Sequence, residues 1–295
     1  MAKTWLITGS SRGLGLALSR AVLDHGDLLV ATARQPEQLS ELVDRYGDQV
    51  RAVALDVTDP AAARAAVQTA LDAFGSLDVV ANNAGYANSA PIEETSDEDF
   101  RAQIETNLFG VVNVTKAALP VLHRQRSGHF LQFSSIGGRV GGTPGLAAYQ
   151  TAKFGVEGFS EVLANEVRPL GIAVTIVEPG AFRTDWGGSS MRIAEVGPDY
   201  EETVGRVHEL RRAMDGKQAG DPARAAKILL DVVAMPDPPL RLLLGSDAVH
   251  LAEQAAQARA QEAATWAPVS RSTDYDGSAD FADTPVADLL SPKSR

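Results

Sequence analysis

The chain of 295 residues contains no cysteine and no long hydrophobic run. The missing thiols exclude disulfides, thiolate metal sites and cysteine nucleophiles together. No apolar stretch approaches the roughly 18 residues that span a bilayer. Residues 1–8 carry one lysine without the apolar region of a signal peptide. From these absences we expect a cytoplasmic protein with no membrane association.

Positive charge is also scarce: the chain has 27 Lys and Arg residues against 38 Asp and Glu residues, which gives a net charge of −11. Such a surface repels phosphate backbones, so we expect no nucleic-acid partner, although local basic spots can still bind a small anionic cofactor. The hydrophobic share of 44% is enough for a sizeable core. The length suits either two domains or one large domain with a tail.

Short apolar runs alternate with amphipathic segments along most of the chain. Strand-like runs cover residues 4–8, 28–33, 50–55, 77–81, 129–133, 172–177 and 240–244. Helical patterns cover residues 14–25, 38–46, 61–74, 100–126, 147–168, 221–234 and 248–266, with a kink expected at Pro120. This alternation predicts an α/β fold: a single Rossmann-type, doubly wound parallel sheet of about seven strands with helices on both faces.

Two segments depart from this rhythm. Residues 182–220 mix tryptophan, methionine and charged residues, and they predict a mobile substrate lid within a domain of residues 1–267. The apolar side chains there either line that lid or pack against the body of the domain: Phe182, Trp186, Met191 and Met214. Residues 268–295 form an acidic, Ser/Pro-rich tail that we expect to be poorly ordered or draped on the surface.

A glycine-rich turn follows the first predicted strand and opens the first helix, with the pattern Thr8-Gly9-x-x-x-Gly13-x-Gly15. Glycines allow positive φ and a close approach of the backbone to a bound group. The helix that begins there directs its free N–H groups and its positive dipole end at an anion, such as a pyrophosphate. The alternative is a glycine-rich turn without a ligand.

This spacing resembles the classical short-chain dehydrogenase/reductase family, over about residues 3–245 and most closely its bacterial 17β-hydroxysteroid-dehydrogenase-like carbonyl reductases. The N-N-A-G segment at 82–85 and the P-G-x-x-x-T segment at 179–184 match the same family. The resemblance implies a cofactor-binding role for Gly9, Ser11, Arg12, Gly13, Leu14, Gly15, Arg34, Asp56, Val57, Asn83, Ala84, Gly85, Tyr149, Lys153, Pro179, Gly180 and Thr184.

Tyr149 and Lys153 are four residues apart on a predicted helix and so share one face. A cation near the phenol lowers its pKa and suits it to proton transfer, whereas the alternative is an ordinary surface pair. By resemblance, Tyr149 is the catalytic acid/base, and Lys153 is its electrostatic partner and a ribose ligand. Ser135 is the catalytic serine by the same resemblance, and Asn107 supports a proton-relay water unless it only packs its helix.

One departure lies between Ser135 and Tyr149, which are separated by one residue more than is usual in the family. The segment 141–144 is rich in glycine, and such loops absorb insertions. Choosing Ser134 instead makes the spacing worse. The shape of the loop over the substrate is therefore in question, while the chemistry is not.

The strand at 28–33 ends at Arg34 with no carboxylate to bind ribose hydroxyls. Arg34 and Arg12 suit a 2′-phosphate, so we predict NADP(H) in preference to NAD(H), unless both are solvated surface arginines. His123 and His208 have no partner at metal spacing, so we predict no metal site.

These observations predict an NAD(P)-dependent oxidoreductase that interconverts a ketone and a secondary alcohol, specifically an NADPH-dependent carbonyl reductase with a small and apolar substrate. Two alternatives stay open: an NADP-binding regulator or scaffold with the same fold, and an epimerase or dehydratase that uses the same site. The resemblance further implies a homodimer or homotetramer built on the helices at 100–126 and 147–168.

Overall fold

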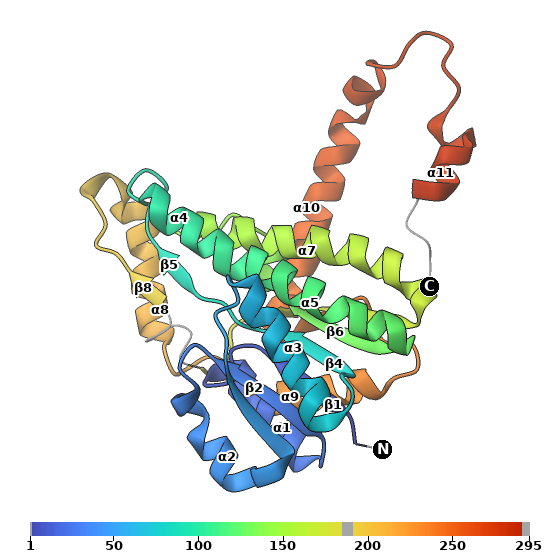
Figure 1. Ribbon diagram of the computed structural model, residues 1–295. Coiled ribbons are helices and arrows are strands. Elements are labelled where there is room, and N and C mark those ends of the chain that lie inside the picture. Colours follow the sequence, from blue (N-terminus) through green and yellow to red (C-terminus); the bar gives the residue numbers. More distant parts are fainter. Residues whose placement is uncertain (1, 185–190, 291–295) are drawn as a thin grey trace. The chain divides into compact units, whose positions relative to one another are not determined.

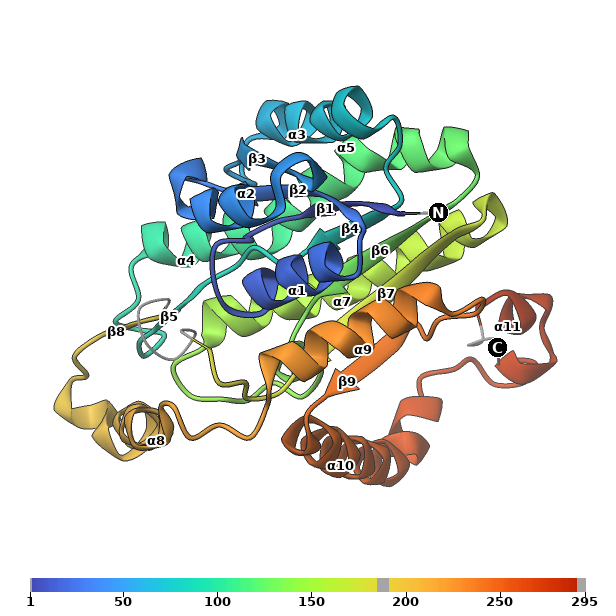
Figure 2. The same cartoon turned by 90° about the horizontal axis from the view of Figure 1, so that it is seen from below.

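The computed structural model describes residues 2–184 and 191–290. Seven strands form one parallel sheet in the order β3-β2-β1-β4-β6-β7-β9, with the central strands labelled in Figure 1 and all of them in Figure 2. They are β1 (Thr4–Ile7), β2 (Leu28–Ala33), β3 (Val50–Ala54), β4 (Val79–Asn82), β6 (Gly128–Phe133), β7 (Ile172–Pro179) and β9 (Arg241–Leu244). Each overlaps one of the predicted apolar runs, and the predicted α/β architecture is confirmed.

The strand order reverses between β1 and β4. From β1 the chain builds outward through β2 to β3, and it then adds β4, β6, β7 and β9 on the other side. Leu6 accordingly pairs with Val30 on one side and with Val80 on the other. In a doubly wound sheet, ligands bind outside the carboxyl ends of the strands at such a switch point. The loops that follow β1 and β4 are therefore the expected walls of a binding site.

Helices cover both faces of the sheet (Figure 2). On one face, α1 (Gly13–Asp24) packs against α9 (Pro222–Ala234), and on the other α3 (Pro60–Phe74), α5 (Gly110–Gln125) and α7 (Ala147–Val167) share a second core. Further helices are α2 (Ser40–Tyr46), α4 (Asp97–Ile104), α6 (Ile136–Arg139), α8 (Arg206–Met214), α10 (Ser246–Arg271) and α11 (Pro285–Leu290). Short 3-10 or π segments are η1 (Pro36–Leu39), η2 (Gly47–Gln49), η3 (Glu105–Phe109), η4 (Arg168–Leu170), η6 (Pro198–Tyr200), η7 (Glu201–Gly205) and η8 (Phe281–Asp283).

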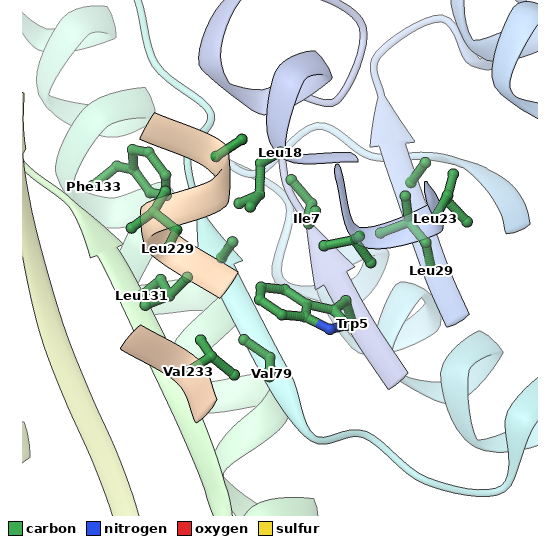
Figure 3. Close-up of a cluster of buried hydrophobic side chains, with 14 of the residues drawn as sticks. Trp5, Ile7, Leu18, Leu23, Leu29, Val79, Leu131, Phe133, Leu229 and Val233 are labelled. Atoms are coloured by element: carbon green, nitrogen blue, oxygen red, sulfur yellow. The ribbon is translucent and has the colours of Figure 1, made fainter. Parts of the chain in front are cut away.

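The first core lies between the sheet and helices α1 and α9 (Figure 3). Trp5 of β1 is fully buried there among aliphatic side chains that include Leu18 and Leu229. Its indole nitrogen still donates a hydrogen bond to Asp27 Oδ2 at 3.0 Å, which satisfies the one polar atom of the ring. The carboxyl end of β1, with the loop that follows it, is thereby fixed to a rigid layer.

Helix starts follow their capping residues. Asp221 accepts hydrogen bonds from the amides of Ala223 and Arg224, and Pro222 is the first residue of α9, which agrees with the helical pattern predicted at residues 221–234. Asp59 caps α3 and Ser96 caps α4 in the same way.

The long helix predicted at residues 100–126 is divided in the structure. Helix α4 ends at Ile104, η3 adds a π-helical turn over Glu105–Phe109, and α5 begins at Gly110. Pro120, where a kink was expected, lies inside α5, and the helical pattern changes at another position. The change occurs around Asn107, whose side-chain amide donates to the Gln103 carbonyl oxygen at 2.9 Å.

The segment 182–220 carries more regular structure than the lid prediction implied. Its strand β8 (Met191–Ile193) pairs in parallel with β5 (Ala87–Ser89), and η6, η7 and α8 follow. In the described part of the chain, none of the helices has the combined length and apolar character that crossing a membrane requires.

The chain divides into two compact units, Met1–Ala252 and Glu253–Arg295. The first contains the whole sheet and both cores. The second contains the remainder of α10, then η8 and α11, so the expected irregular tail includes helical turns. Helix α10 runs to Arg271, beyond the predicted end at residue 266.

Candidate active site

Tyr149 and Lys153 lie one turn apart on α7. Their side chains are buried, with 7% and 4% exposed, which rules out a solvated surface pair. The Lys153 ammonium nitrogen lies 5.7 Å from the centre of the Tyr149 ring. It also donates a hydrogen bond to the Phe133 carbonyl oxygen at 2.7 Å. Because Phe133 ends β6, the sheet itself fixes the ammonium group beside the phenol.

Ser135 follows β6 and reaches the same phenol. Its hydroxyl acts on the Tyr149 phenol, in the direction that lowers the Tyr149 pKa. As the N-cap of α6, it also accepts one from the Gly137 amide at 3.0 Å. The Ser134 hydroxyl is buried and instead donates toward the Lys153 carbonyl oxygen at 3.5 Å. The structure therefore brings Ser135, rather than Ser134, to the tyrosine.

The loop between Ser135 and Tyr149 contains three glycines in the left-handed region. Gly141, Gly142 and Gly145 have φ values of 76°, 78° and 83°. Residues with a Cβ adopt this region only at a cost, so the glycines let the loop turn sharply and absorb the extra residue. The altered spacing leaves the contact between the serine and the tyrosine intact.

Burial dominates the protonation of both central groups. It raises the pKa of Tyr149 to about 12, while the Ser135 hydrogen bond and the charge of Arg211 lower that pKa. Burial also lowers the pKa of Lys153 to about 8, while the charge of Glu157 raises it. The Tyr149 pKa is therefore raised and not lowered as expected, because the loss of water around the phenol outweighs the charges near it.

Asn107 is fully buried in the π-helical turn η3. Its side-chain amide donates to the Tyr86 carbonyl oxygen at 2.8 Å, and its carbonyl accepts from the Tyr86 amide at 3.0 Å. A Cβ on Gly85 would lie 2.5 Å from Asn107 Oδ1 and 3.7 Å from Lys153 Nζ. Asn107 thus holds the chain segment that passes beside the Lys153 ammonium group.

The glycine loop after β1 fits a bound anion. Gly9 and Gly13 have positive φ values of 70° and 57°. A Cβ on Gly15 would lie 2.2 Å from the Gly9 carbonyl oxygen, so only glycine allows this close packing. Arg12 is the N-cap residue of α1 and makes no capping hydrogen bond through its side chain, which leaves the first amides of the helix available to phosphate oxygens. Ser11 and Leu14 belong to the same turn, and Leu14 packs against the first core.

The loops after β1 and β4 are tied together across the switch point. The Thr8 hydroxyl accepts hydrogen bonds from the amides of Asn83 and Ala84, each at 2.9 Å. The Asn83 side chain donates in return to the Thr8 carbonyl oxygen at 2.9 Å. The predicted residues Asn83, Ala84 and Gly85 therefore lie beside the glycine loop.

The predicted adenosine contacts lie at the ends of β2 and β3. Arg12, Arg34 and Asp56 are exposed, so these charged groups are open to a ligand. Asp56 Oδ1 already accepts from the amide and the hydroxyl of Thr58, at 2.9 and 2.7 Å. Val57 is buried against Gly110, where a Cβ would lie 2.5 Å from Val57 Cγ2. No acidic side chain replaces Arg34 at the end of β2.

The segment after β7 reaches the glycine loop from the other side. Pro179 ends β7, and a Cβ on Gly180 would lie 2.3 Å from Asp247 Oδ1, so a side chain does not fit there. A Cβ on Gly13 would lie 3.7 Å from Thr184 Cβ, so Thr184 faces the loop. The residues predicted to hold a dinucleotide thus follow the carboxyl ends of the strands, where a doubly wound sheet has its ligand-binding crevice, and they fit such a group.

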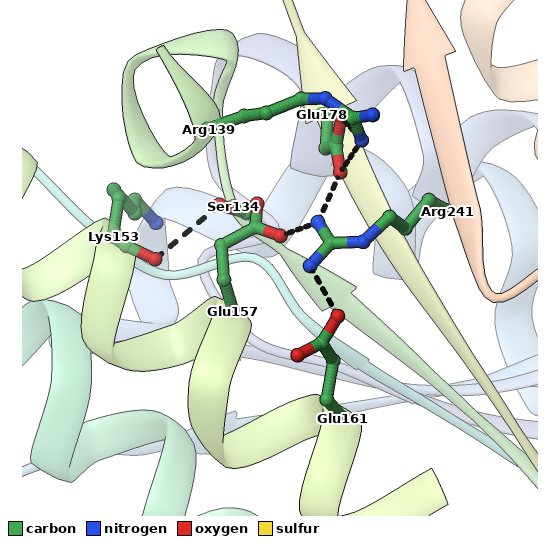
Figure 4. A network of polar contacts seen from close by, with 7 residues as sticks. All are labelled: Ser134, Arg139, Lys153, Glu157, Glu161, Glu178 and Arg241. Atoms are coloured by element: carbon green, nitrogen blue, oxygen red, sulfur yellow. Dashed lines mark hydrogen bonds and ion pairs between the residues drawn. The ribbon is translucent and has the colours of Figure 1, made fainter. Parts of the chain in front are cut away.

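A network of charged side chains lies near Lys153, and its member Glu157 is the carboxylate that raises the Lys153 pKa (Figure 4). The buried Glu178 carboxylate of β7 accepts hydrogen bonds from Arg139 at 3.2 Å and from Arg241 at 2.6 Å. Arg241 also pairs with Glu157 and Glu161, which project from α7 after Lys153. Sequence reasoning missed this network, because its members come from four separate elements and form no local pattern.

The predicted apolar lid residues separate in the structure. Met191 is buried in a cluster with Tyr149, Ala87 and Leu146, whereas Phe182 packs against the first core and Met214 is exposed. Trp186 lies outside the described residues. Within the described chain, no group of three or more His, Asp and Glu side chains could hold a metal ion.

Comparison with known proteins gives consistent results. The family model for short chain dehydrogenases matches residues 3–192. Oxidoreductase BOA17 of Botryotinia fuckeliana is 51% identical over 271 residues, covering 92% of this chain and 98% of that protein. The structure of a short-chain dehydrogenase from Streptomyces avermitilis superposes with a TM-score of 0.86 at 39% identity, covering 92% of this chain and 100% of that one.

A more distant structure carries a ligand. An alcohol dehydrogenase from the archaeon Thermococcus sibiricus, complexed with 5-hydroxy-NADP, has a TM-score of 0.67 at 28% identity. It covers 83% of this chain and 96% of its own.

Proposed function

The chain belongs to the short-chain dehydrogenase/reductase family of oxidoreductases, and we propose that it is an NADPH-dependent carbonyl reductase that interconverts a ketone and a secondary alcohol. One observation carries the proposal. The buried Tyr149 phenol lies beside Lys153, whose ammonium group is fixed to the end of β6, and Ser135 follows the same strand. The glycine loop follows β1 at the carboxyl edge of the same parallel sheet. Proton transfer and dinucleotide binding are thereby available at one site.

Each side chain has a role that follows from its position. A nicotinamide cofactor held by the glycine loop would supply the hydride, and the Tyr149 phenol gives its proton to the carbonyl oxygen as negative charge develops there. A pKa of about 12 keeps that phenol protonated and ready to donate. The Ser135 hydroxyl donates a hydrogen bond to the same oxygen. The Lys153 ammonium group, fixed by Phe133, stabilises the phenolate that remains.

The preference for NADPH rests on the adenosine end of the crevice. Arg34 and Arg12 are exposed there, and a guanidinium binds a phosphate through two parallel hydrogen bonds. The Thermococcus sibiricus relative holds an NADP derivative, which supports the same choice. The proposal also includes the closer likeness to 17β-hydroxysteroid-dehydrogenase-like reductases, a cytoplasmic location and assembly into a homodimer or homotetramer.

The test is NADPH oxidation by the full-length protein against a panel of ketones, with identification of the products. We expect a secondary alcohol from at least one ketone. Cofactor binding without turnover of any ketone would instead favour a regulator or scaffold. A product with inverted stereochemistry or one lost water, formed without net NADPH consumption, would favour an epimerase or dehydratase.

A further inference from the structure

Arg211 of α8 extends from the segment 182–220 toward the catalytic tyrosine. Its guanidinium is partly buried, and Nη1 lies 3.1 Å from the Ser89 hydroxyl and 3.9 Å from the Met191 sulfur. Met191 belongs to the buried cluster that includes Tyr149. The charge of Arg211 also acts on the phenol, in the direction that lowers the Tyr149 pKa. A fixed positive charge therefore lies at the Tyr149 end of the site.

Within residues 2–184 and 191–290, no carboxylate pairs with Arg211. Among the described residues, its hydrogen-bond partners are a neutral hydroxyl and a thioether. The partly buried Arg139 and Arg241, by contrast, each bind the Glu178 carboxylate. A cation taken out of water without a counter-charge is costly, and such a group is stable where an anion can join it.

The surrounding side chains hold Arg211 in place. Ser89 accepts its hydrogen bond and also bonds to the Nε2 atom of His208 at 2.8 Å. His208 is fully buried one turn earlier on α8, and burial lowers its pKa, so it is neutral near pH 7. A Cβ on Gly145 would lie 2.7 Å from the Ser89 hydroxyl, so the loop before α7 packs directly on this group. The guanidinium is thus preorganised relative to Tyr149.

Arg211 is separate from the dinucleotide crevice. The residues predicted to hold the phosphates and the adenosine follow β1 to β4 and β7. Arg211 instead contacts β5 and β8, which form their own two-stranded sheet. Its charge is therefore placed for the substrate rather than for the cofactor.

We propose that Arg211 binds an anionic group of the substrate, so that the enzyme prefers ketones carrying a carboxylate or a phosphate over neutral ketones. This inference rests on the proposed carbonyl reductase function and specifies its substrate class. A guanidinium matches the two oxygens of either anion, and the experiment below distinguishes them.

The experiment compares matched substrates with the full-length protein and NADPH. Levulinate and acetoacetate are paired with their methyl esters, and dihydroxyacetone phosphate is paired with dihydroxyacetone. In the wild type we expect the anion of at least one pair to have a KM about 10- to 100-fold lower, the range for a hydrogen bond to a charged group. Arg211→Gln should remove this preference, and Arg211→Lys should retain part of it.

Arg212→Gln is the matched control, because Arg212 is the exposed neighbour on the same helix and loses the same charge. It should keep the wild-type preference. If Arg211 acted only on the Tyr149 pKa or on folding, Arg211→Gln would lower kcat for anion and ester alike, or lower the melting temperature, with no change in their KM ratio. Either result, or equal KM values within every pair in the wild type, would overturn the inference.

Calorimetric binding of the same anions to the protein–NADP⁺ complex separates this inference from the proposed function. If the wild type binds an anion, Arg211→Gln abolishes this binding and no ketone is reduced, the anion site is confirmed and the proposed carbonyl reductase function is contradicted. If neutral ketones are reduced and no anion binds in an Arg211-dependent way, the carbonyl reductase function is confirmed and the anion site is contradicted.

Discussion

At the scale of single residues, Tyr149 combines two requirements that oppose each other. Its burial excludes water and raises the phenol pKa to about 12, whereas Ser135 and Arg211 lower that pKa. A high pKa favours the proton-bearing form that reduction needs. The neighbouring donors and charges then stabilise the negative charge once the proton has moved.

Replacing Tyr149 with Phe tests this role. The change removes one oxygen from a well-packed ring, so the melting temperature and NADPH affinity should stay near those of the wild type. Turnover of the best ketone should fall by about 10²- to 10⁴-fold, the usual contribution of a general acid. Steady-state kinetics and fluorescence titration of NADPH measure the two effects, and a near-normal kcat would show that another group donates the proton.

Arg34→Asp tests cofactor choice at the opposite end of the crevice. It places a carboxylate where the 2′-phosphate of NADPH is expected and offers an acceptor to the ribose hydroxyls of NADH. The loss of one hydrogen bond to a charged group should lower kcat/KM for NADPH by about 10- to 100-fold. The kcat/KM for NADH should stay the same or rise. Arg64→Asp, an exposed change of equal charge on α3, is the control. A wild type that prefers NADH contradicts the assignment.

Lys153 gives stability a pH dependence that can be measured. Burial lowers its pKa to about 8 from 10.5, so between these values the unfolded chain binds a proton that the folded protein does not. The free energy of unfolding should therefore rise with pH through this window, relative to Lys153→Met, by about 2 kcal/mol at about pH 9.5. Urea unfolding of both proteins at several pH values measures the difference, and parallel profiles would show that Lys153 titrates normally.

At the scale of elements, the regular part of the fold could be predicted because its causes are local. The apolar runs that form β1, β2 and β6 are buried on both sides, and the helical pattern predicted at residues 221–234 matches α9 with its N-cap Asp221. The three-residue strands β5 and β8 were missed, because they are stabilised by pairing across a long stretch of chain.

The π-helical turn at η3 also could not be predicted from local sequence. It depends on Asn107 bonding to Tyr86 and Gln103, and only the Gln103 contact is local in sequence. Sequence motifs indicated Tyr149, Lys153, Ser135 and the glycine loop. They gave no sign of Arg211, whose partners come from other elements.

The network around Glu178 links β7, β9, α6 and α7, and Glu178→Gln tests how much it stabilises them. The buried carboxylate binds both Arg139 and Arg241, and its replacement by an amide removes a charged acceptor from both guanidinium groups, while Arg241 keeps Glu157 and Glu161. Because the amide still accepts a hydrogen bond, we expect unfolding to become about 1–3 kcal/mol easier. Glu161→Gln removes a half-exposed partner of the same Arg241 and should cost less than about 1 kcal/mol. Equal losses in the two variants would contradict a special role for the buried carboxylate.

At the scale of the whole molecule, the first unit already contains what the proposed chemistry requires. Residues 1–252 hold the complete sheet, both hydrophobic cores and every predicted catalytic and cofactor-binding residue. The buried side chains of α10, Ala248 and Ala252, also lie within this unit. Domain assignment from composition placed the boundary at residue 267, and composition has no means of locating a division inside a continuous helix.

A chain that ends at Gln257 tests whether the first unit is sufficient. It keeps Ala248 and Ala252 with one further turn of helix, so the cores lose no buried side chain. We expect it to fold, to bind NADPH and to reduce the best ketone with kcat/KM close to that of the full-length protein, measured by circular dichroism, titration and steady-state kinetics. Light scattering on both proteins shows whether residues 258–295 influence assembly, since several apolar side chains there are exposed, including Trp266, Tyr275 and Phe281. A truncated protein that folds and assembles normally but has lost turnover would show that residues 258–295 contribute to the active site.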